Sequence, residues 1–275
     1  MDQSTIGIFL SQKRYAEELL KKAKMFKCNP VSTPMEPGIK LSKTGEGDKV
    51  DASKYRSLIG SLRYLTNTRP DLMLSVGITS RFMEEPRYSH WKALKRILRY
   101  VKGSISFRLM FTKSDNYRLT GYLDSDWCGD MDDQKSTTVY VFFMGNTSFT
   151  WLSKKQPIVA LSTCEAEYVV ASWSVRHVVW LRNLLSKLEI MQGEKVLIRV
   201  DNKSAIELDK NPVNHERSKH IDVHFHFIKE KVKERSVELE HVGSKEQIAD
   251  IFTKPLPTTS FQEFRKLLEM REKKF

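Results

Sequence analysis

Residues 118–130, RLTGYLDSDWCGD, constrain the fold more than any other stretch of the chain. Small or apolar residues alternate there with mostly polar ones, and this period of two predicts a β-strand. The strand ends on an acidic pair, Asp124 and Asp126. A second predicted strand, VLIRVDN at 196–202, ends near another carboxylate, Asp201. Carboxylates crowded at the ends of adjacent strands repel one another unless a cation lies between them, so this pattern predicts a metal site.

The charge is distributed unevenly along the 275 residues. The chain carries 46 Lys and Arg against 34 Asp and Glu, a net charge of +12. Residues 1–115 hold 22 of the cations and 11 of the acids, whereas residues 116–275 hold 24 and 23. A basic first part beside a nearly neutral, acid-centred second part suggests that one holds a polyanion and the other processes it. The alternative is that the cations merely keep helices in solution.

Other features of the composition bound the class of protein. A hydrophobic content of 40% suits a packed core. The apolar runs are too short to span a bilayer, and the first ten residues lack the basic region of a signal peptide. Three widely spaced cysteines without a CxxC pair indicate a reducing compartment. We therefore expect a globular protein without a membrane partner.

The first hundred residues are predicted to be mostly helical. A short apolar strand at 6–10 precedes a helix from about Gln12, and residues 29–48 have the Pro, Gly, Lys and Ser content of a linker. Three helices follow, the first capped by Asp51, the second beginning at Pro70 and the third running from Ser89 to Gly103.

The third of these helices carries an apolar stripe and a cationic one. The cationic stripe is a predicted phosphate-binding ridge made of Lys92, Lys95, Arg96, Arg99 and Lys102. An ordinary solvated helix surface is the alternative interpretation of the same five side chains.

Strand periodicity returns after Ser104. The alternation there predicts an antiparallel meander with strands at 105–113, 118–126, 138–144 and 147–152. A long helix then begins at an S-x-x-E capping box, Ser162 and Glu165. Because Glu165 is occupied as a cap, Glu167 is the better candidate for a metal ligand. His177 lies on the predicted buried face of this helix and is interpreted as a core histidine.

The last part of the chain contains a cluster of histidines that invites a zinc interpretation: His215, His220, His224 and His226. No cysteine or third ligand is suitably placed and HExxH is absent, so a basic helix that faces nucleic acid is favoured. A strand at 237–242 follows. A capping box, Ser244 and Gln247, then predicts a helix that carries Asp250 near its start. A final amphipathic helix is predicted at 261–272.

Many strings of residues resemble, in order, the C-terminal part of the Pol polyproteins of Ty1/copia-type LTR retrotransposons, particularly plant ones. Six strings resemble the ribonuclease H end of these polyproteins: YLDSDWCGD, KST at 135–137, LSTCEAEY, VDNKSA, RSKHIDVHFHFI and QIADIFTKPL. Three further strings resemble the segment that joins polymerase to nuclease: YRSLIGSLRYLTNTRPDL, SRFMEEP and ALKRILRYVKG. The string GIFLSQKRYAEELLKKAKM resembles the end of the reverse transcriptase.

The resemblance implies an α/β (α+β) ribonuclease H-like fold, with a mixed five-stranded sheet, helices on both faces and a mostly helical segment before it. It divides the chain into a C-terminal remnant of reverse transcriptase at 1–35, a linker at 36–50, a helical connection segment at 51–104, a ribonuclease H-like domain at 105–258 and a C-terminal helix at 259–275.

The resemblance also implies a site and a reaction. Two Mg²⁺ ions, or Mn²⁺ as a substitute, would be held by Asp124, Glu167, Asp201 and Asp250, and the RNA strand of an RNA–DNA hybrid would be cleaved. His241 would help proton transfer or product release, with an ordinary surface histidine as the alternative. Asp126 is expected to be a turn residue or a support for a ligand. Further contacts to nucleic acid are expected from Lys154, Lys155, Asn202 and Lys219.

The chain departs from the family pattern in several places, and other functions are also compatible with its residues. The paired aspartates of a polymerase palm are absent, so DNA synthesis is not expected, and the upstream polymerase segment is a candidate partner. Val139 stands where relatives usually carry Gly, which is expected to disturb the hairpin. An inactive relic that binds nucleic acid is the main alternative; an integrase or transposase fits the order of the acids less well. The expected location is cytoplasmic, with a virus-like particle or the nucleus as alternatives.

Overall fold

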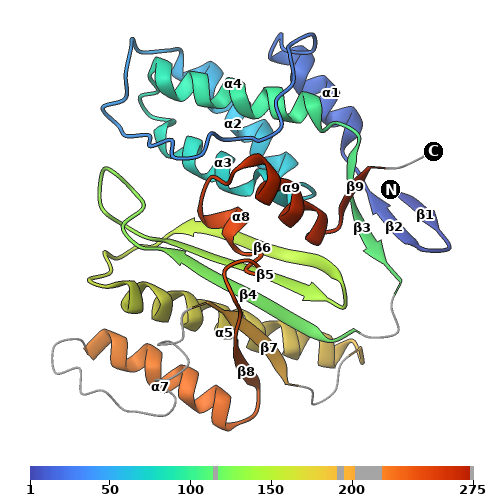
Figure 1. Cartoon of the computed structure of the whole chain (residues 1–275), viewed down its shortest axis with the longest axis vertical. Helices are drawn as coiled ribbons and strands as arrows, with labels where there is room; N and C mark the ends of the chain where they lie inside the picture. The colour runs from blue at the N-terminus through green and yellow to red at the C-terminus, as the bar shows by residue number, and fades with distance from the viewer. Residues whose placement is uncertain (114–116, 191–194, 202–218, 273–275) are drawn as a thin grey trace. The chain divides into compact units, whose positions relative to one another are not determined.

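The computed structural model describes residues 1–113, 117–190, 195–201 and 219–272, with the backbone alone for 219–225. The chain forms two compact units (Figure 1). Unit 1 comprises Met1–Lys113 and Lys254–Phe275, and unit 2 comprises Ser114–Thr253. Unit 2 is therefore inserted into unit 1 along the sequence.

Unit 1 combines a small antiparallel sheet with helices. The sheet has the order β1-β2-β3-β9, and its strands are β1 (Asp2–Ser4), β2 (Gly7–Leu10), β3 (Phe107–Thr112) and β9 (Met270–Glu272). Its helices are α1 (Lys13–Lys22), α2 (Ala52–Leu65), η1 (Pro70–Leu72), α3 (Met73–Thr79), η2 (Ser80–Phe82), α4 (Tyr88–Gly103) and α9 (Thr258–Leu267). The predicted cap of α2 is present, because the Asp51 side chain accepts from the backbone N–H groups of Ser53 and Lys54.

Two predictions for unit 1 are wrong in detail. The strand predicted at 105–113 exists as β3, but it pairs with β2 and β9 and not with the strand at 118–126. The predicted four-stranded meander therefore loses its first strand, and residues 105–113 belong to unit 1. The helix predicted at 259–275 ends at Leu267, and β9 follows it, because pairing with β3 satisfies the backbone of Met270–Glu272.

The segment predicted to be a linker lies packed along α4. The backbone N–H groups of Tyr88 and Ser89 donate to the carbonyls of Asp48 and Glu46 at 2.9 and 3.1 Å. His90 is fully buried and stacks on Phe82. Since its Nδ1 accepts from the Arg87 N–H, its Nε2 carries the proton and donates to the Ser42 carbonyl at 2.8 Å.

Unit 2 is built on a mixed five-stranded sheet of order β6-β5-β4-β7-β8. The strands are β4 (Leu119–Asp126), β5 (Thr137–Met144), β6 (Thr147–Lys155), β7 (Val196–Val200) and β8 (Val237–His241). β4, β5 and β6 are antiparallel, whereas β7 runs parallel to both β4 and β8. This is the predicted ribonuclease H-like α/β arrangement.

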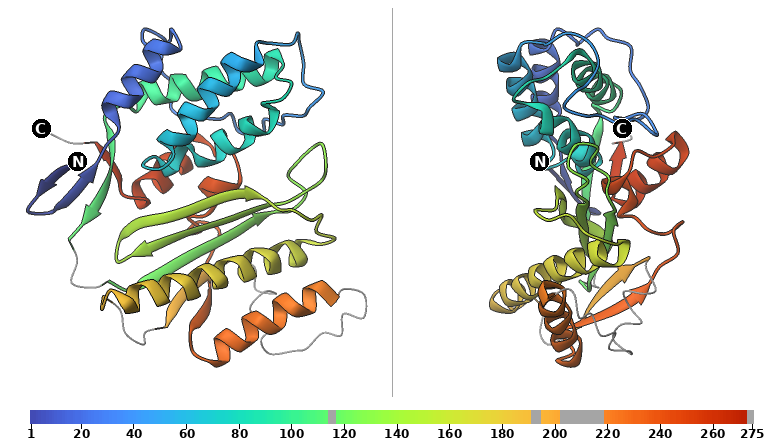
Figure 2. Two further views of the ribbon diagram at one scale, coloured as in Figure 1. Left: turned by 180° about the vertical axis from the view of Figure 1, so that it is seen from behind. Right: turned by 90° about the vertical axis from the view of Figure 1, so that its left-hand side faces the viewer.

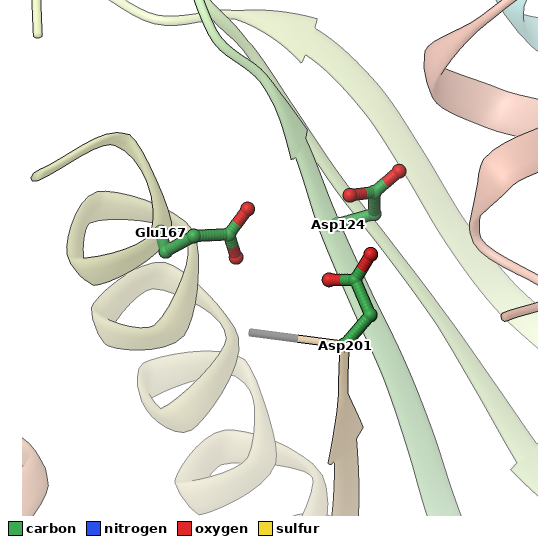
Figure 3. A group of neighbouring side chains, drawn as sticks. All are labelled: Asp124, Glu167 and Asp201. Atoms are coloured by element: carbon green, nitrogen blue, oxygen red, sulfur yellow. The ribbon is translucent and has the colours of Figure 1, made fainter. Parts of the chain in front are cut away.

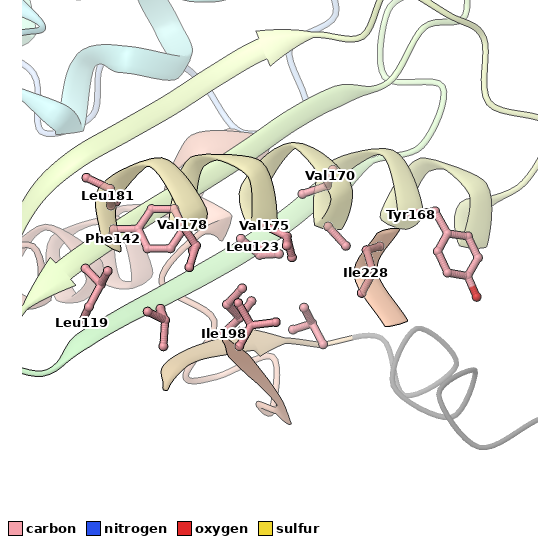
Figure 4. Packing of buried hydrophobic residues seen from close by; sticks show 14 of the residues in the cluster. Leu119, Leu123, Phe142, Tyr168, Val170, Val175, Val178, Leu181, Ile198 and Ile228 are labelled. Atoms are coloured by element: carbon pink, nitrogen blue, oxygen red, sulfur yellow. The ribbon is translucent and has the colours of Figure 1, made fainter. Parts of the chain in front are cut away.

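Helices cover both faces of this sheet (Figure 2). The long α5 (Thr163–Lys187) packs on one face, beside α7 (Lys219–Lys233). The short α8 (Asp250–Thr253) packs against β4, β5 and β6. The core between α5 and the sheet is formed by aliphatic and aromatic side chains that include Leu119, Leu123, Phe142, Val175, Val178 and Ile198 (Figure 4). Burial of this apolar surface holds β4, β7 and α5 in fixed positions.

The sequence pattern places nine residues in and just after α5 on one buried face: Ala166, Val169, Val170, Trp173, His177, Trp180, Leu181, Leu184 and Leu188. The structure confirms this for only part of them. Val169, Val170 and Leu181 are buried, but Trp180, Leu184 and Leu188 are 56, 40 and 58% exposed. Leu181 and Leu185 are buried in the core, so the buried face near the end of the helix follows these two residues and not Trp180, Leu184 and Leu188. Even so, among the described residues no helix is both long and apolar enough to cross a membrane.

Candidate metal centre

The sheet brings two acidic strand ends together. β4 and β7 are parallel neighbours in which Thr120, Gly121 and Tyr122 stand opposite Leu197, Ile198 and Arg199. The same register carries Asp124 opposite Asp201, one residue beyond the end of β7. Side chains that are opposite in parallel strands lie on the same face of a sheet, so the two carboxylates converge.

The third carboxylate comes from the first turns of α5. Ser162 caps this helix by accepting from the Glu165 N–H at 3.1 Å, and Glu165 reaches back to accept from the Leu161 N–H at 2.7 Å. The cap fixes the start of the helix and leaves Glu167 directed toward the sheet (Figure 3). One ligand oxygen each from Asp124, Glu167 and Asp201 lies within 4.8 Å of the others.

The fourth predicted acid, Asp250, lies beside Asp124 and is 5% exposed. It is the first residue of α8, and two side chains place that helix. The Thr253 hydroxyl donates to Asp124 Oδ2 at 2.6 Å, and the buried Gln247 amide donates to the Leu123 carbonyl at 2.8 Å. The predicted capping box at Ser244 is therefore wrong: Gln247 contacts the site strand, and the helix begins at Asp250.

The carboxylates of Asp124, Glu167, Asp201 and Asp250 lie close together, and burial and their mutual repulsion raise the pKa of two of them. Burial raises the pKa of Asp124 to about 8; the Thr253 hydrogen bond opposes this rise, and the neighbouring Asp201 and Asp250 add to it. Burial also raises the pKa of Glu167 well above its ordinary value, with Asp124 and Asp201 contributing and the Ser125 backbone opposing. A bound cation would remove this repulsion.

The donors fit a hard divalent cation. All four predicted ligands offer carboxylate oxygens, which Mg²⁺ and Mn²⁺ prefer, and no thiol or imidazole joins the cluster within the described residues. The Asp124 carboxylate is also oriented from outside, since it accepts from the Ser125 N–H at 2.8 Å and from Thr253.

The other residues of the predicted site have varied surroundings. His241 is exposed, and its backbone is paired opposite Val200, next to Asp201. Asp126, expected to be a turn residue or a support for a ligand, is the last residue of β4, and its carboxylate accepts from the Thr137 N–H and lies against Gly129. Val139 is fully buried and in regular register with Asp124 and Ser153, so the expected disturbance of the hairpin is not seen.

The predicted contacts to nucleic acid divide into two groups. In unit 1, Arg96 and Arg99 bind the segment before α2, whereas Lys92, Lys95 and Lys102 extend from α4, with Lys102 over the Phe26 ring. In unit 2, Lys155 pairs with Asp130 and Asp133, and Lys154 lies over the Trp173 ring. Some predicted residues lie outside the described side chains: Asn202, His215, Lys219, His220 and His224. His226 is described and is exposed.

Two residues that orient the site were not predicted. Thr253 and Gln247 contact β4 through single hydrogen bonds across more than 120 positions of sequence. No local pattern marks such a contact. His177, in contrast, is half-buried between Tyr140 and Trp180, close to the core role expected for it.

Several curated proteins are similar to the chain. The retrovirus-related Pol polyprotein from transposon RE1 of Arabidopsis thaliana is 41% identical over 94% of this chain and 18% of its own length. That from transposon TNT 1-94 of Nicotiana tabacum is 41% identical over 98% of the chain and 21% of its own length. An uncharacterized mitochondrial protein of Arabidopsis thaliana is 39% identical over 63% of the chain and 72% of its own length. The chain thus spans about a fifth of the two polyproteins.

Solved structures give more distant similarities. LC11-RNase H1 in complex with RNA/DNA hybrid is 15% identical, with a TM-score of 0.37 over 50% of this chain and 94% of that one. The foamy viral protease-reverse transcriptase in complex with RNA/DNA hybrid is 11% identical, with a TM-score of 0.46 over 78% of this chain and 27% of that one. No family model matches the sequence.

Proposed function

The chain belongs to the retrovirus-related Pol polyproteins of copia-type transposons, and from this premise we propose that unit 2 is a ribonuclease H that cleaves the RNA strand of RNA–DNA hybrids. The observation that carries the proposal is the convergence of Asp124, Glu167 and Asp201, with Asp250 beside them. Buried acids that raise one another's pKa are a costly arrangement unless they serve a bound cation.

The four carboxylates would hold Mg²⁺, as two ions, with Mn²⁺ able to replace it. Such a pair of ions supplies activation of the attacking water and charge stabilisation at the leaving oxygen. The protein's part is to fix the ligands: the ladder between β4 and β7 sets Asp124 against Asp201, the cap of α5 sets Glu167, and Thr253 sets Asp124. The exposed His241, beside Asp201 at the sheet edge, is the candidate for proton transfer or product release.

The proposed substrate is a hybrid duplex recognised by shape and by the RNA 2′-hydroxyls, with little dependence on base sequence. Lys154 is exposed at the end of β6 and is a candidate phosphate contact in unit 2. An upstream polymerase segment would be a natural partner in holding a long hybrid, and we propose that the chain can act on short hybrids without it.

The test uses an end-labelled RNA–DNA hybrid with a duplex DNA of the same sequence beside it. With Mg²⁺ the chain should cut only the RNA of the hybrid, and both EDTA and Asp201→Asn should abolish cutting. Asp132→Asn is the matched control, because it makes the same chemical change at an exposed position in the turn after β4 and leaves the cap of α5 intact. Hybrid binding without cleavage in the unaltered chain would contradict the proposal and select the inactive, nucleic-acid-binding alternative.

A further inference from the structure

Unit 1 contains a cavity of about 880 Å³ between α4 and the segment 36–47. This volume lies in the range of sites that hold small organic ligands. One wall is a single face of α4, where Ser89, Lys92 and Arg96 recur at helical spacing. The cavity therefore occupies the face that carries most of the predicted cationic ridge.

The opposite wall is held in place by specific contacts. Arg96 donates to Glu36 at 2.6 Å and to Thr33 at 3.0 Å, and buried His90 donates to the Ser42 carbonyl. Glycines let the segment lie close to the helix: a Cβ at Gly45 would lie 2.5 Å from Ser89 Oγ, and Gly47 has a φ of +82°. The wall is thus built onto α4 and is not a loose linker.

The lining is suited to an anion with a flat apolar body. Five cations line it against two carboxylates, and one of those carboxylates, Glu36, is already paired with Arg96. Ile39, Leu41 and Tyr88 add apolar surface. Lys40, Lys92 and Lys95 are exposed at the cavity, so their ammonium groups can reach a ligand.

We propose that this cavity binds one nucleotide unit, with its phosphate on Lys92 and Lys95 and its base against the apolar wall. The nucleotide comes either from a nucleic-acid strand or from free nucleotide, since both present the same phosphate and ring. This site is independent of the carboxylate cluster of unit 2 and of any cleavage there.

Binding is measured in the Asp201→Asn background with EDTA, so that the outcome does not depend on nuclease activity. The probes are a fluorescein-labelled 12-nucleotide single strand, followed by anisotropy, and dAMP, followed by calorimetry. The double variant Lys92→Gln/Lys95→Gln removes the exposed cations of the wall. Lys102→Gln is the matched control, because Lys102 is on the same helix but outside the lining.

If the cavity takes a strand, the double variant should weaken binding about tenfold and lower the salt slope by about one for each lysine, while Lys102→Gln changes little. If it takes free nucleotide, dAMP should bind with a stoichiometry of one and the double variant should abolish that binding. Equal binding by the double variant and Lys102→Gln, or no binding of either probe, overturns the proposal.

Discussion

Two buried carboxylates, Asp71 in unit 1 and Asp124 in unit 2, have charged neighbours of opposite sign, cations beside Asp71 and acids beside Asp124. They are 2 and 6% exposed. Asp71 accepts from Arg69 Nε and Nη2 at 2.9 and 2.7 Å and from the Tyr100 hydroxyl at 2.5 Å. Within the described residues, Asp124 accepts from two neutral donors, the Ser125 N–H and the Thr253 hydroxyl, and the charged groups around it are other acids.

The pKa values of the two groups differ accordingly. Burial by itself raises the pKa of Asp71, but the Arg69 guanidinium, together with the Tyr100 hydroxyl and Arg265, outweighs burial and holds that pKa below its ordinary value. Burial and acidic neighbours raise the pKa of Asp124 to about 8. The degree of burial is similar, so the sign of the neighbouring charges makes the difference. Unit 1 supplies its own counter-charge, whereas unit 2 leaves that role to a bound cation.

The largest expected effect on stability is at Asp71, whose charge is paired with Arg69. Asp71→Ala leaves Arg69 buried without its partner, so the free energy of unfolding of unit 1 should fall by about 3–5 kcal/mol. Glu18→Ala, which breaks only the exposed pair with Arg14, should change it by less than about 0.5 kcal/mol. Urea unfolding measures both. Similar small losses in the two variants would mean that the buried pair is not what stabilises this region.

At Asp124, whose charged neighbours in the described part of the chain are acids, removal of the carboxylate should raise the free energy of unfolding instead of lowering it. Without divalent ions at pH 8, Asp124→Asn removes one of several crowded charges and should stabilise unit 2 by on the order of 2 kcal/mol. Asp132→Asn, an exposed position in the nearby turn, should be close to neutral. Denaturant unfolding in EDTA tests this, and destabilisation by Asp124→Asn would contradict the proposed repulsion.

The stability of unit 2 should depend on pH because of Asp124. The folded pKa of Asp124, about 8, lies above its ordinary value of 3.8, so the folded state retains a proton that the unfolded state loses. The associated stability is present below pH 3.8 and is lost as the pH rises to 8. In EDTA the midpoint of thermal unfolding should fall between pH 5 and 8, and Mg²⁺ should reverse the fall. The same scan of Asp124→Asn, with a shallower slope expected, separates this carboxyl from the other titrating groups.

The smallest effect is expected at the supporting hydroxyl. Thr253→Val removes the donor that orients Asp124 and should weaken Mg²⁺ binding about tenfold, whereas Thr253→Ser should retain it. A titration of thermal stability with Mg²⁺ gives the affinities. Equal affinity in the two variants would show that the hydroxyl does not orient the ligand.

Much of unit 2 could be predicted because its signals are local. Alternation marks β4 and β7, the S-x-x-E pattern marks the start of α5, and an acid at the end of a strand marks Asp124 and Asp201. The convergence of Asp124 with Asp201 follows once the two strands are neighbours. The sequence therefore indicated the candidate ligands well, although their roles remain predictions.

The features that were missed depend on distant partners. Periodicity identifies β3 as a strand but does not say that β2 and β9 are its neighbours. The three residues of β9 have no strand pattern of their own and adopt one because β3 offers an edge. Gln247 matched a capping box, yet its amide donates to Leu123 far away in sequence, so a tertiary hydrogen bond displaced the local one.

The central claim is that the carboxylates of unit 2 are a binding site for divalent cations, and crystals soaked in Mn²⁺ test it most directly through anomalous scattering. The account predicts anomalous peaks within ligand distance of Asp124, Glu167 and Asp201, and their loss in Asp201→Asn. Crystals in which Mn²⁺ binds elsewhere, and the three carboxylates keep their spacing without an ion, would contradict it.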